Sequence, residues 1–208
     1  MQEIKPISSY KQGLKDKILL DAMRSFAEKG IRAVKMDDIA AHLSISKRTL
    51  YEIYANKEDL LFEGVRRYHH EMEQRISQIN ESGENVMEVM LNVYQLKVEE
   101  FNTTNMAFYE DLAKYPAVID YLQCENKKLH ALHMSLLERG VSEGFFRSDI
   151  NFELASMLFN ALGRYVMSEE LYRKFSINDI FNNLVFVSLR GFCTEMGVKA
   201  LDKFQLSY

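Results

Sequence analysis

The chain of 208 residues has no tryptophan, only two prolines and only nine glycines. Because proline and glycine are the residues that most often interrupt a helix, this scarcity favours long helices. The two cysteines, Cys124 and Cys193, lie far apart, so no disulfide framework is indicated. We expect two buried or partly buried thiols in a reducing cytoplasm.

Long hydrophobic runs are also absent. No apolar stretch reaches the roughly 18–20 residues needed to cross a bilayer. The first residues, MQEIKPISSY, lack the apolar segment of a signal peptide. We therefore expect a cytoplasmic protein without a membrane partner. Apolar residues still make up 47% of the chain, which is ample for a folded core.

Motifs for catalysis are missing as well. The sequence contains no glycine-rich phosphate loop, no nucleophile elbow and no HExxH motif. Neighbouring carboxylates such as Glu99 and Glu100 would point apart on a helix. We therefore expect neither an enzyme nor a bound cofactor.

The segment 34–61, VKMDDIAAHLSISKRTLYEIYANKEDLL, predicts two short helices joined by a tight turn. Met36, Ile39, Ala40 and Leu43 fall on one helical face. Ile45 would plug the space between the two helices. Ser46 is a good N-cap for the second helix, because its hydroxyl can accept a hydrogen bond from a free backbone N–H.

The second helix has Leu50, Ile53 and Tyr54 for its buried face, which leaves a mainly basic and aromatic face outside. A helix of this length fits the major groove of B-DNA, which is about 12 Å wide. Charge is distributed accordingly. Residues 1–70 carry 13 Lys and Arg against 10 Asp and Glu, a balance of +3, whereas residues 71–208 have a balance of −7. A basic module joined to an acidic body is typical of a DNA reader with a separate sensing domain.

The first third of the chain resembles the DNA-binding domain of the TetR family of transcriptional regulators. The resemblance rests on Ile18, Ala22, Phe26, Gly30, Asp38-Ile39-Ala40, Ile45-Ser46, Thr49-Leu50-Tyr51, Tyr54 and Lys57-Glu58-Asp59-Leu60-Leu61. The segment Gly144-Phe145-Phe146-Arg147-Ser148-Asp149 followed by Glu153-Leu154-Ala155 also resembles the family's entry into its dimerisation region. The sequence departs from the family's pattern at Ser44, where the turn glycine is common, at Lys35 and at Tyr54.

The resemblance implies contacts with a double-stranded DNA operator. Lys47, Arg48 and Thr49 would approach base edges, and Arg48 is the best candidate for a guanine contact. The residues expected to hold phosphates are Lys35, Ser46, Tyr51, Tyr54 and Lys57. For Tyr54 the alternative is a core position.

The fold class is expected to be all-α. We expect nine helices: about 12–29, the two of the helix-turn-helix, then 57–79, 84–101, 106–114, 116–139, 152–172 and 178–197. Residues 1–56 would form a three-helix DNA-binding domain, and residues 57–208 a helical domain for ligand binding and dimerisation.

The last two expected helices carry more apolar surface than one protomer needs. The resemblance implies that they pair across a two-fold axis, so that a homodimer reads a palindrome. The expected interface residues are Leu154, Leu158, Leu162, Tyr165, Phe181, Leu184, Val185 and Phe192. The alternative is that these residues form the core of a monomer.

In proteins of this family the fifth to eighth helices would enclose a small-molecule effector. Aromatic and methionine side chains suit an apolar, irregular or planar ligand. The candidates are Met90, Tyr94, Phe101, Phe108, Tyr109, Tyr121, His130, His133 and Phe159. Such residues at helical spacing are more often simple core packing. His130 and His133 lack a metal-ligand spacing with other donors, so no metal is expected.

The sequence therefore predicts a homodimeric, ligand-responsive transcriptional regulator, most simply a repressor. One rival is a ligand-binding or scaffold protein whose helix-turn-helix contacts a protein partner. The other is a helical enzyme that uses an interior pocket.

Overall fold

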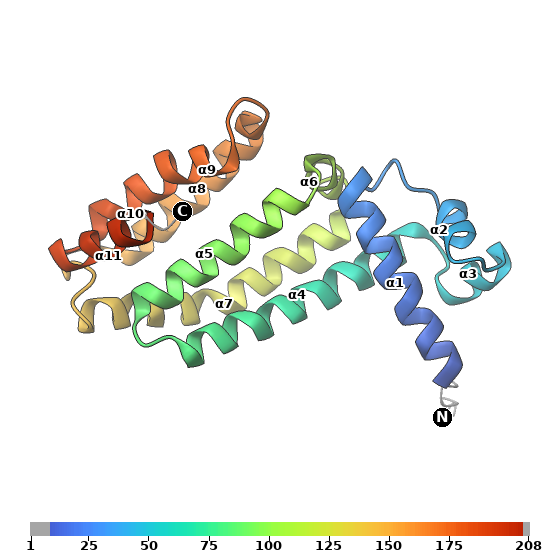
Figure 1. The fold of residues 1–208 in the computed structure, drawn as a ribbon, viewed down its shortest axis with the longest axis horizontal. Helices are drawn as coiled ribbons and strands as arrows, with labels where there is room; N and C mark the ends of the chain where they lie inside the picture. Colours follow the sequence, from blue (N-terminus) through green and yellow to red (C-terminus); the bar gives the residue numbers. More distant parts are fainter. Residues whose placement is uncertain (1–8, 206–208) are drawn as a thin grey trace. The chain divides into compact units, whose positions relative to one another are not determined.

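The structure is a computed structural model that describes residues 9–205, and within that range it is built from helices (Figure 1). Its regular elements are α1 (Ser9–Lys29), α2 (Met36–His42), α3 (Lys47–Ile53), α4 (Lys57–Ser82), α5 (Val86–Thr103), α6 (Met106–Leu112), α7 (Pro116–Ser142), α8 (Phe152–Ser168), the 3-10 turn η1 (Leu171–Arg173), α9 (Ile177–Ile180), the π-helical turn η2 (Phe181–Val185), α10 (Phe186–Phe192) and α11 (Glu195–Gln205). The expected all-α class is confirmed. None of the described helices combines the length and apolar content that crossing a membrane requires.

The described chain divides into two compact units. Unit 1 contains residues 9–73 and 103–122, and unit 2 contains residues 74–102 and 123–205. This division differs from the sequence-based boundary at residue 57. The first part of α4, all of α6 and the start of α7 belong with the N-terminal helices, because their apolar residues pack into the same core.

The core of unit 1 forms where α1 to α4 converge. Ile18, Ala22 and Phe26 of α1 are fully buried, together with Leu50 of α3 and Leu60 of α4. Side chains from α6, from the start of α7 and from the connection between them complete this core, namely Phe108, Leu112, Tyr115, Val118 and Leu122. At roughly 1.5–3 kcal/mol for each fully buried large apolar side chain, this packing fixes where α2 and α3 lie.

Two positions in unit 1 have left-handed backbone conformations. Gly30 ends α1 with φ of 84°, as predicted for a helix stop. Ser44, in the turn between α2 and α3, has φ of 54°. This conformation costs a residue with a Cβ atom about 1–2 kcal/mol, so the backbone at Ser44 is strained where glycine would not be.

The core of unit 2 is built from α5, α10 and α11. Val86, Met87 and Leu91 of α5 pack with Phe186 of α10 and Leu201 of α11. The start of α5 is fastened to the end of α7, because Glu143 accepts the Val86 N–H at 2.6 Å and the Arg139 Nε–H at 2.6 Å. Burial would raise the pKa of Glu143, but these two donors lower it overall.

The end of the chain departs from the prediction. The expected helix 178–197 is wrong at its C-terminal end, because α10 stops at Phe192 and a separate helix, α11, follows. The break arises from pairing with a distant segment. Phe146 and Cys193 form a β-bridge, and Thr194 donates its N–H to the Phe145 carbonyl at 2.9 Å. The Thr194 hydroxyl then accepts the Gly197 N–H and so begins α11.

The other predicted helices lie close to their expected positions. The expected helix 152–172 ends earlier, at Ser168, and residues 171–173 form the separate turn η1. Cys193 is buried, as expected, and burial raises the pKa of its thiol to about 11. Cys124 is exposed, so the expectation of two buried thiols is wrong for this residue.

Candidate DNA-binding interface

The helix-turn-helix is held by local capping interactions. Asp38 in the first turn of α2 accepts the Lys35 N–H at 2.9 Å. Ser46 caps α3 as predicted, since its Oγ accepts the Thr49 N–H at 3.0 Å. Ile45 is partly buried and packs against the core of unit 1, which matches its predicted role as the plug of the turn.

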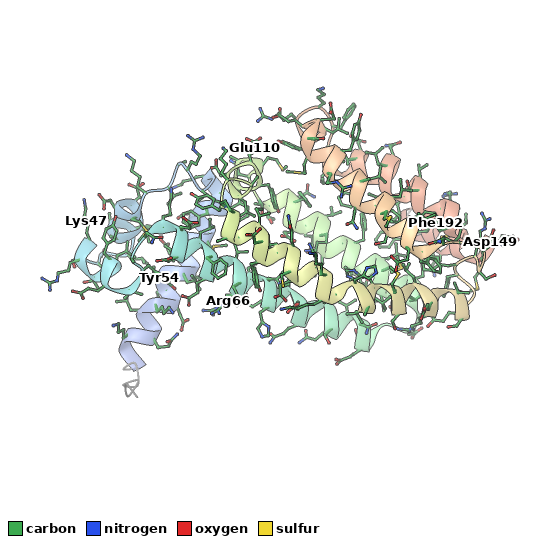
Figure 2. All side chains as sticks on the ribbon, turned by 180° about the vertical axis from the view of Figure 1, so that it is seen from behind. Lys47, Tyr54, Arg66, Glu110, Asp149 and Phe192 are labelled. Carbon is green, nitrogen blue, oxygen red and sulfur yellow. The ribbon has the colours of Figure 1, made fainter. Side chains whose placement is uncertain are left out.

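The outward face of α3 carries the residues expected to meet bases. Lys47, Arg48 and Tyr51 are exposed, and Thr49 is half-buried with its hydroxyl 2.8 Å from that of Ser46. Lys47 projects from the surface of the protein (Figure 2). Lys35 at the start of α2 is also exposed. This surface presents cationic, hydroxyl and phenolic groups on the helix that would enter a major groove.

Each of the two basic side chains on α3 has an acidic partner. Lys47 Nζ lies 2.5 Å from Asp37 Oδ2 of α2, and Arg48 Nε lies 2.8 Å from Glu52 Oε1, one turn further along α3. The hydrogen bond and the charge of each acid raise the pKa of its basic partner. Asp37 and Glu52 were not among the sequence-based candidates, although the spacing from Arg48 to Glu52 is a visible signal for a helical ion pair.

Tyr54 lies in the core. Only 3% of it is exposed, and Lys15 Nζ sits 5.6 Å from the centre of its ring. Burial, and then the nearby Glu63 carboxylate, raises the pKa of the phenol well above its usual value. A side chain this enclosed cannot reach a phosphate, so the structure supports the core alternative for Tyr54.

Lys57 also points inward. Its ammonium donates to the Ile31 carbonyl at 2.9 Å and to the Val34 carbonyl at 3.0 Å. Burial lowers the pKa of this lysine. Two of the three donors of Lys57 therefore hold the loop that leads into α2, and a phosphate contact through the third donor stays a prediction.

The same loop is held from the other side by α6. Asp111 accepts the Arg32 N–H at 2.8 Å and the Lys114 ammonium at 3.1 Å, and it is only 7% exposed. Asn105, the N-cap of α6, donates its N–H to the Ala27 carbonyl at 2.7 Å. Helix α6 is thus hydrogen-bonded to the backbone just before the helix-turn-helix of α2 and α3. No local sequence pattern reveals this link.

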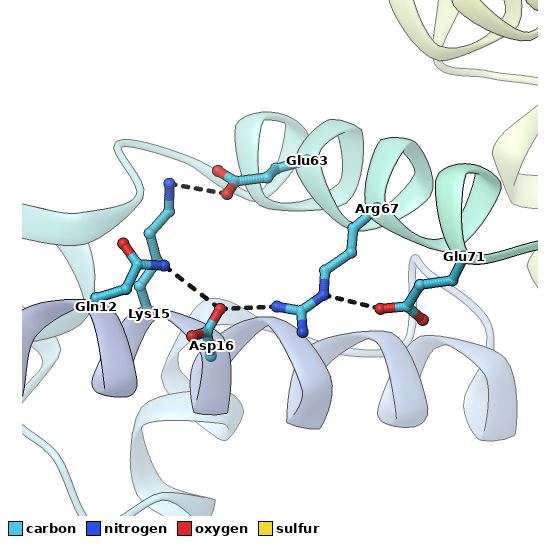
Figure 3. Close-up of polar contacts among 6 residues, drawn as sticks. All are labelled: Gln12, Lys15, Asp16, Glu63, Arg67 and Glu71. Atoms are coloured by element: carbon cyan, nitrogen blue, oxygen red, sulfur yellow. Dashed lines mark hydrogen bonds and ion pairs between the residues drawn. The ribbon is translucent and has the colours of Figure 1, made fainter. Parts of the chain in front are cut away.

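Ion pairs join α1 to α4 along the surface of unit 1 (Figure 3). Lys15 Nζ lies 2.8 Å from Glu63 Oε1. Arg67 contacts Asp16 at 2.7 Å and Glu71 at 3.0 Å, so it bridges the two helices. These contacts, together with the shared core, fix the angle between α1 and α4 within this unit.

The residues expected to surround an effector fall into two sets. Phe108 packs against the core of unit 1, and the ring of Tyr109 lies 5.4 Å from that of Phe108. Tyr121 makes edge contacts with Phe62 and His69 at 5.6 and 5.8 Å. These three expected residues belong to the same unit as the helix-turn-helix, and the contacts are those of core packing.

The other candidates lie in unit 2 and are Met90, Tyr94, Phe101, His130, His133 and Phe159. The Tyr94 ring contacts Phe181 at 5.0 Å and Phe186 at 4.6 Å. Met90, Tyr94 and Phe159 all pack against the unit's core. His130 pairs with Glu153 at 3.2 Å, and His133 is exposed.

The expected dimer residues include an exposed apolar face on α8. Leu154 is 63% exposed and Tyr165 is 52% exposed, with Met157 and Leu158 between them also exposed. Met157, Leu158 and Tyr165 follow Leu154 by three, four and eleven positions, so the four side chains share one face of the helix. Phe181 and Phe192 instead contact Tyr94 and Phe159 within the protomer, and they are partly buried, as are Leu162, Leu184 and Val185.

Known proteins match this chain in both sequence and fold. Residues 18–63 match the family described as "Bacterial regulatory proteins, tetR family". The HTH-type transcriptional repressor KstR2 of Rhodococcus jostii is 31% identical over 153 residues, which cover 71% of this chain and 75% of that protein. KstR2 of Mycobacterium tuberculosis is 30% identical over 139 residues, covering 64% of this chain and 69% of that protein.

Solved structures show the same fold. The ketosteroid transcriptional regulator KstR2 of Mycobacterium tuberculosis superposes with a TM-score of 0.58 at 23% identity, covering 91% of this chain and 97% of that one. A putative transcriptional regulator from Saccharomonospora viridis, solved in complex with choline, gives a TM-score of 0.70 at 20% identity, covering 88% of this chain and 100% of that one. The fold agrees with the sequence matches, and the sequence matches show that the chain belongs to the TetR family of DNA-binding transcriptional regulators.

Proposed function

We propose that the protein is a homodimeric repressor that binds a palindromic operator and is released by a small apolar or aromatic molecule. The observation that carries the proposal is the exposed basic face of α3, held on a fully packed three-helix module. Arg48 and Lys47 meet bases in this proposal, with Thr49 beside them. Lys35 and Tyr51 contact phosphates, and Ser46 fixes the start of the reading helix.

Dimerisation is supported by the exposed apolar face of α8. Four large apolar side chains on one helix face, between 42% and 63% exposed, are costly to leave in water. In a two-fold dimer the same face of each protomer covers the other. Two reading helices must then be separated by about one turn of DNA, roughly 34–36 Å, to enter successive major grooves.

Release by an effector is supported by the relatives and by the composition of unit 2. The relatives from Rhodococcus and Mycobacterium are named repressors, and the solved Mycobacterium protein is described as a ketosteroid transcriptional regulator. Met90, Tyr94 and Phe159 give unit 2 an interior of the type that takes apolar ligands. The effector must prefer one separation of the two reading helices, because a ligand with equal affinity for both states shifts nothing.

The experiment is selection of bound duplexes from random DNA by the purified full-length protein, followed by affinity measurements at low and moderate salt. A palindromic consensus is expected. A dimer that neutralises about six to ten phosphates loses roughly 10³- to 10⁵-fold in affinity between about 50 and 200 mM salt. Lys47→Ala should make this salt dependence shallower, whereas Lys127→Ala, an exposed lysine on α7, should leave it unchanged.

Two results would overturn the proposal. If no sequence is enriched and binding does not depend on salt, the helix-turn-helix serves a protein partner instead of DNA. If a non-palindromic site bound by one protomer is recovered, the proposed homodimer is wrong although DNA reading stands.

A further inference from the structure

The pair formed by Arg48 and Glu52 on α3 is not explained by helix stability. Arg48 stands in the first turn of α3, where the helix dipole favours acidic side chains, and Glu52 stands in the last turn, where it favours basic ones. The order of the two charges is also the weaker one for a pair four residues apart. Since 89% of the Arg48 side chain and 59% of the Glu52 side chain are exposed, the pair contributes little to folding.

The geometry of the pair matters for reading a base. Glu52 accepts from Nε of Arg48 at 2.8 Å. Among the described residues no hydrogen bond engages either Nη nitrogen, so the end of the guanidinium stays available. Two Nη–H groups can donate together to O6 and N7 of guanine, which is the commonest specific contact that arginine makes with a base.

Lys47 and Asp37 form a different kind of pair. The lysine ammonium is a compact charge without a fixed fork of donors, so its contact with a base edge does not depend on one fixed orientation of the side chain. Its link to Asp37, at 2.5 Å, joins α3 to α2 and lowers the net positive charge of the surface. It orients no group toward a particular base.

From these contacts we infer that Glu52 is a positioning residue that sets base specificity by holding Arg48 through Nε with its Nη groups directed outward. This inference rests on the proposed function, because it requires α3 to read DNA. On random DNA, Arg48 must leave Glu52 to reach a phosphate. On the operator, Arg48 binds guanine and keeps its bond to Glu52. The carboxylate thus weakens non-operator binding and favours the operator.

The test measures the affinity of the full-length protein and its variants for the selected operator, for the operator with the contacted G·C pair changed to A·T, and for a random duplex. Glu52→Ala should lower the preference for G·C by about threefold to tenfold, the range expected when a long side chain must be ordered at the moment of binding. Glu52→Gln, which keeps an acceptor but loses the charge, should retain part of the preference. Both variants should bind the random duplex about two- to fivefold more tightly, as expected for loss of an exposed ion pair.

Two control variants separate positioning from charge. Asp37→Asn should strengthen binding to all three duplexes without changing the preference for G·C. Glu71→Gln makes the same charge change on α4, where Glu71 pairs with Arg67 in the same Nε geometry at 3.0 Å, and it should also leave the preference unchanged. In an Arg48→Ala background, Glu52→Ala should have no further effect on the preference, because Glu52 acts through Arg48.

The outcomes distinguish this inference from the proposed function. If the unaltered protein shows no operator, both fail. If the protein binds an operator but Glu52→Ala leaves the G·C preference unchanged, or changes it equally in the Arg48→Ala background, the positioning role of Glu52 is wrong and DNA reading by α3 stands.

Discussion

The contact between Asp111 and Arg32 makes a prediction about the stability of the DNA-binding unit. Asp111→Ala removes a buried carboxylate that accepts a backbone N–H at 2.8 Å. A hydrogen bond to a charged group is worth about 1.5–3 kcal/mol, and its loss leaves the Arg32 N–H without this acceptor. The Lys114 partner is 54% exposed, so that ion pair adds about 0–1 kcal/mol. We expect the free energy of unfolding to fall by about 2–3 kcal/mol.

The assay is urea unfolding followed by helical circular dichroism at pH 7. Asp120→Ala, at an exposed position on α7, is the matched control and should change the free energy of unfolding by less than about 0.5 kcal/mol. The loss of unfolding free energy in Asp111→Asn should lie between those of Asp120→Ala and Asp111→Ala, because an amide oxygen still accepts the Arg32 N–H but carries no charge. If the free energy of unfolding of Asp111→Ala lies within about 0.5 kcal/mol of that of the unaltered protein, the proposed link between α6 and the loop before α2 contributes nothing to stability.

The effect should also depend on pH with a defined sign. Although burial raises the pKa of Asp111, the Arg32 N–H and Lys114 lower it overall. A carboxyl whose pKa is lower in the folded protein stabilises the fold above its unfolded pKa of about 3.9, and this contribution disappears as the pH falls through the folded value. The difference in stability between the unaltered protein and Asp111→Ala should be constant from neutral pH to about pH 5 and shrink below about pH 4.

Other positions give further tests. Ser44→Gly should stabilise the protein by about 0.5–1 kcal/mol in urea unfolding, since glycine tolerates the φ of 54°; destabilisation would contradict the strained turn. Leu154→Glu should shift the sedimentation equilibrium toward monomer, while Leu132→Glu, at an exposed leucine on α7, should not. If the two variants have the same monomer–dimer equilibrium, the α8 face is not the dimer interface. In the native protein at neutral pH, iodoacetamide should modify exposed Cys124 and spare Cys193, whose thiol pKa is about 11; rapid modification of both would contradict the packing of unit 2.

The helix-turn-helix could be predicted from the sequence because its signals are local. The apolar spacing of α2, the cap at Ser46 and the stop at Gly30 each depend on residues within about one turn. The beginning of α11 could not be predicted in this way. The chain does not continue α10 at Thr194, because the Thr194 N–H donates to the Phe145 carbonyl. Residues so far apart in sequence form no pattern that a local reading would detect.

The direction of long polar side chains was the weakest part of the prediction for the DNA-binding surface. Tyr54 and Lys57 are of the types that contact phosphate, but packing turned the ring of Tyr54 into the core and the ammonium of Lys57 toward two carbonyls. Asp111 lies 79 positions from Arg32, so only the folded chain shows that it supports the reading module. Lys47, Arg48 and Tyr51 on α3 were predicted correctly to face outward, because helical spacing alone sets the direction of these side chains.

Base reading by Arg48 of α3 is tested best by comparing the unaltered protein with Arg48→Ala on every single-base-pair variant of the selected operator. Arg48→Ala should lose discrimination at one symmetry-related base pair in each half-site, by about 1–3 kcal/mol, and keep it elsewhere. Uniform weakening across all the variants would show that Arg48 contacts phosphate alone. An unchanged profile would show that α3 is not the reading helix.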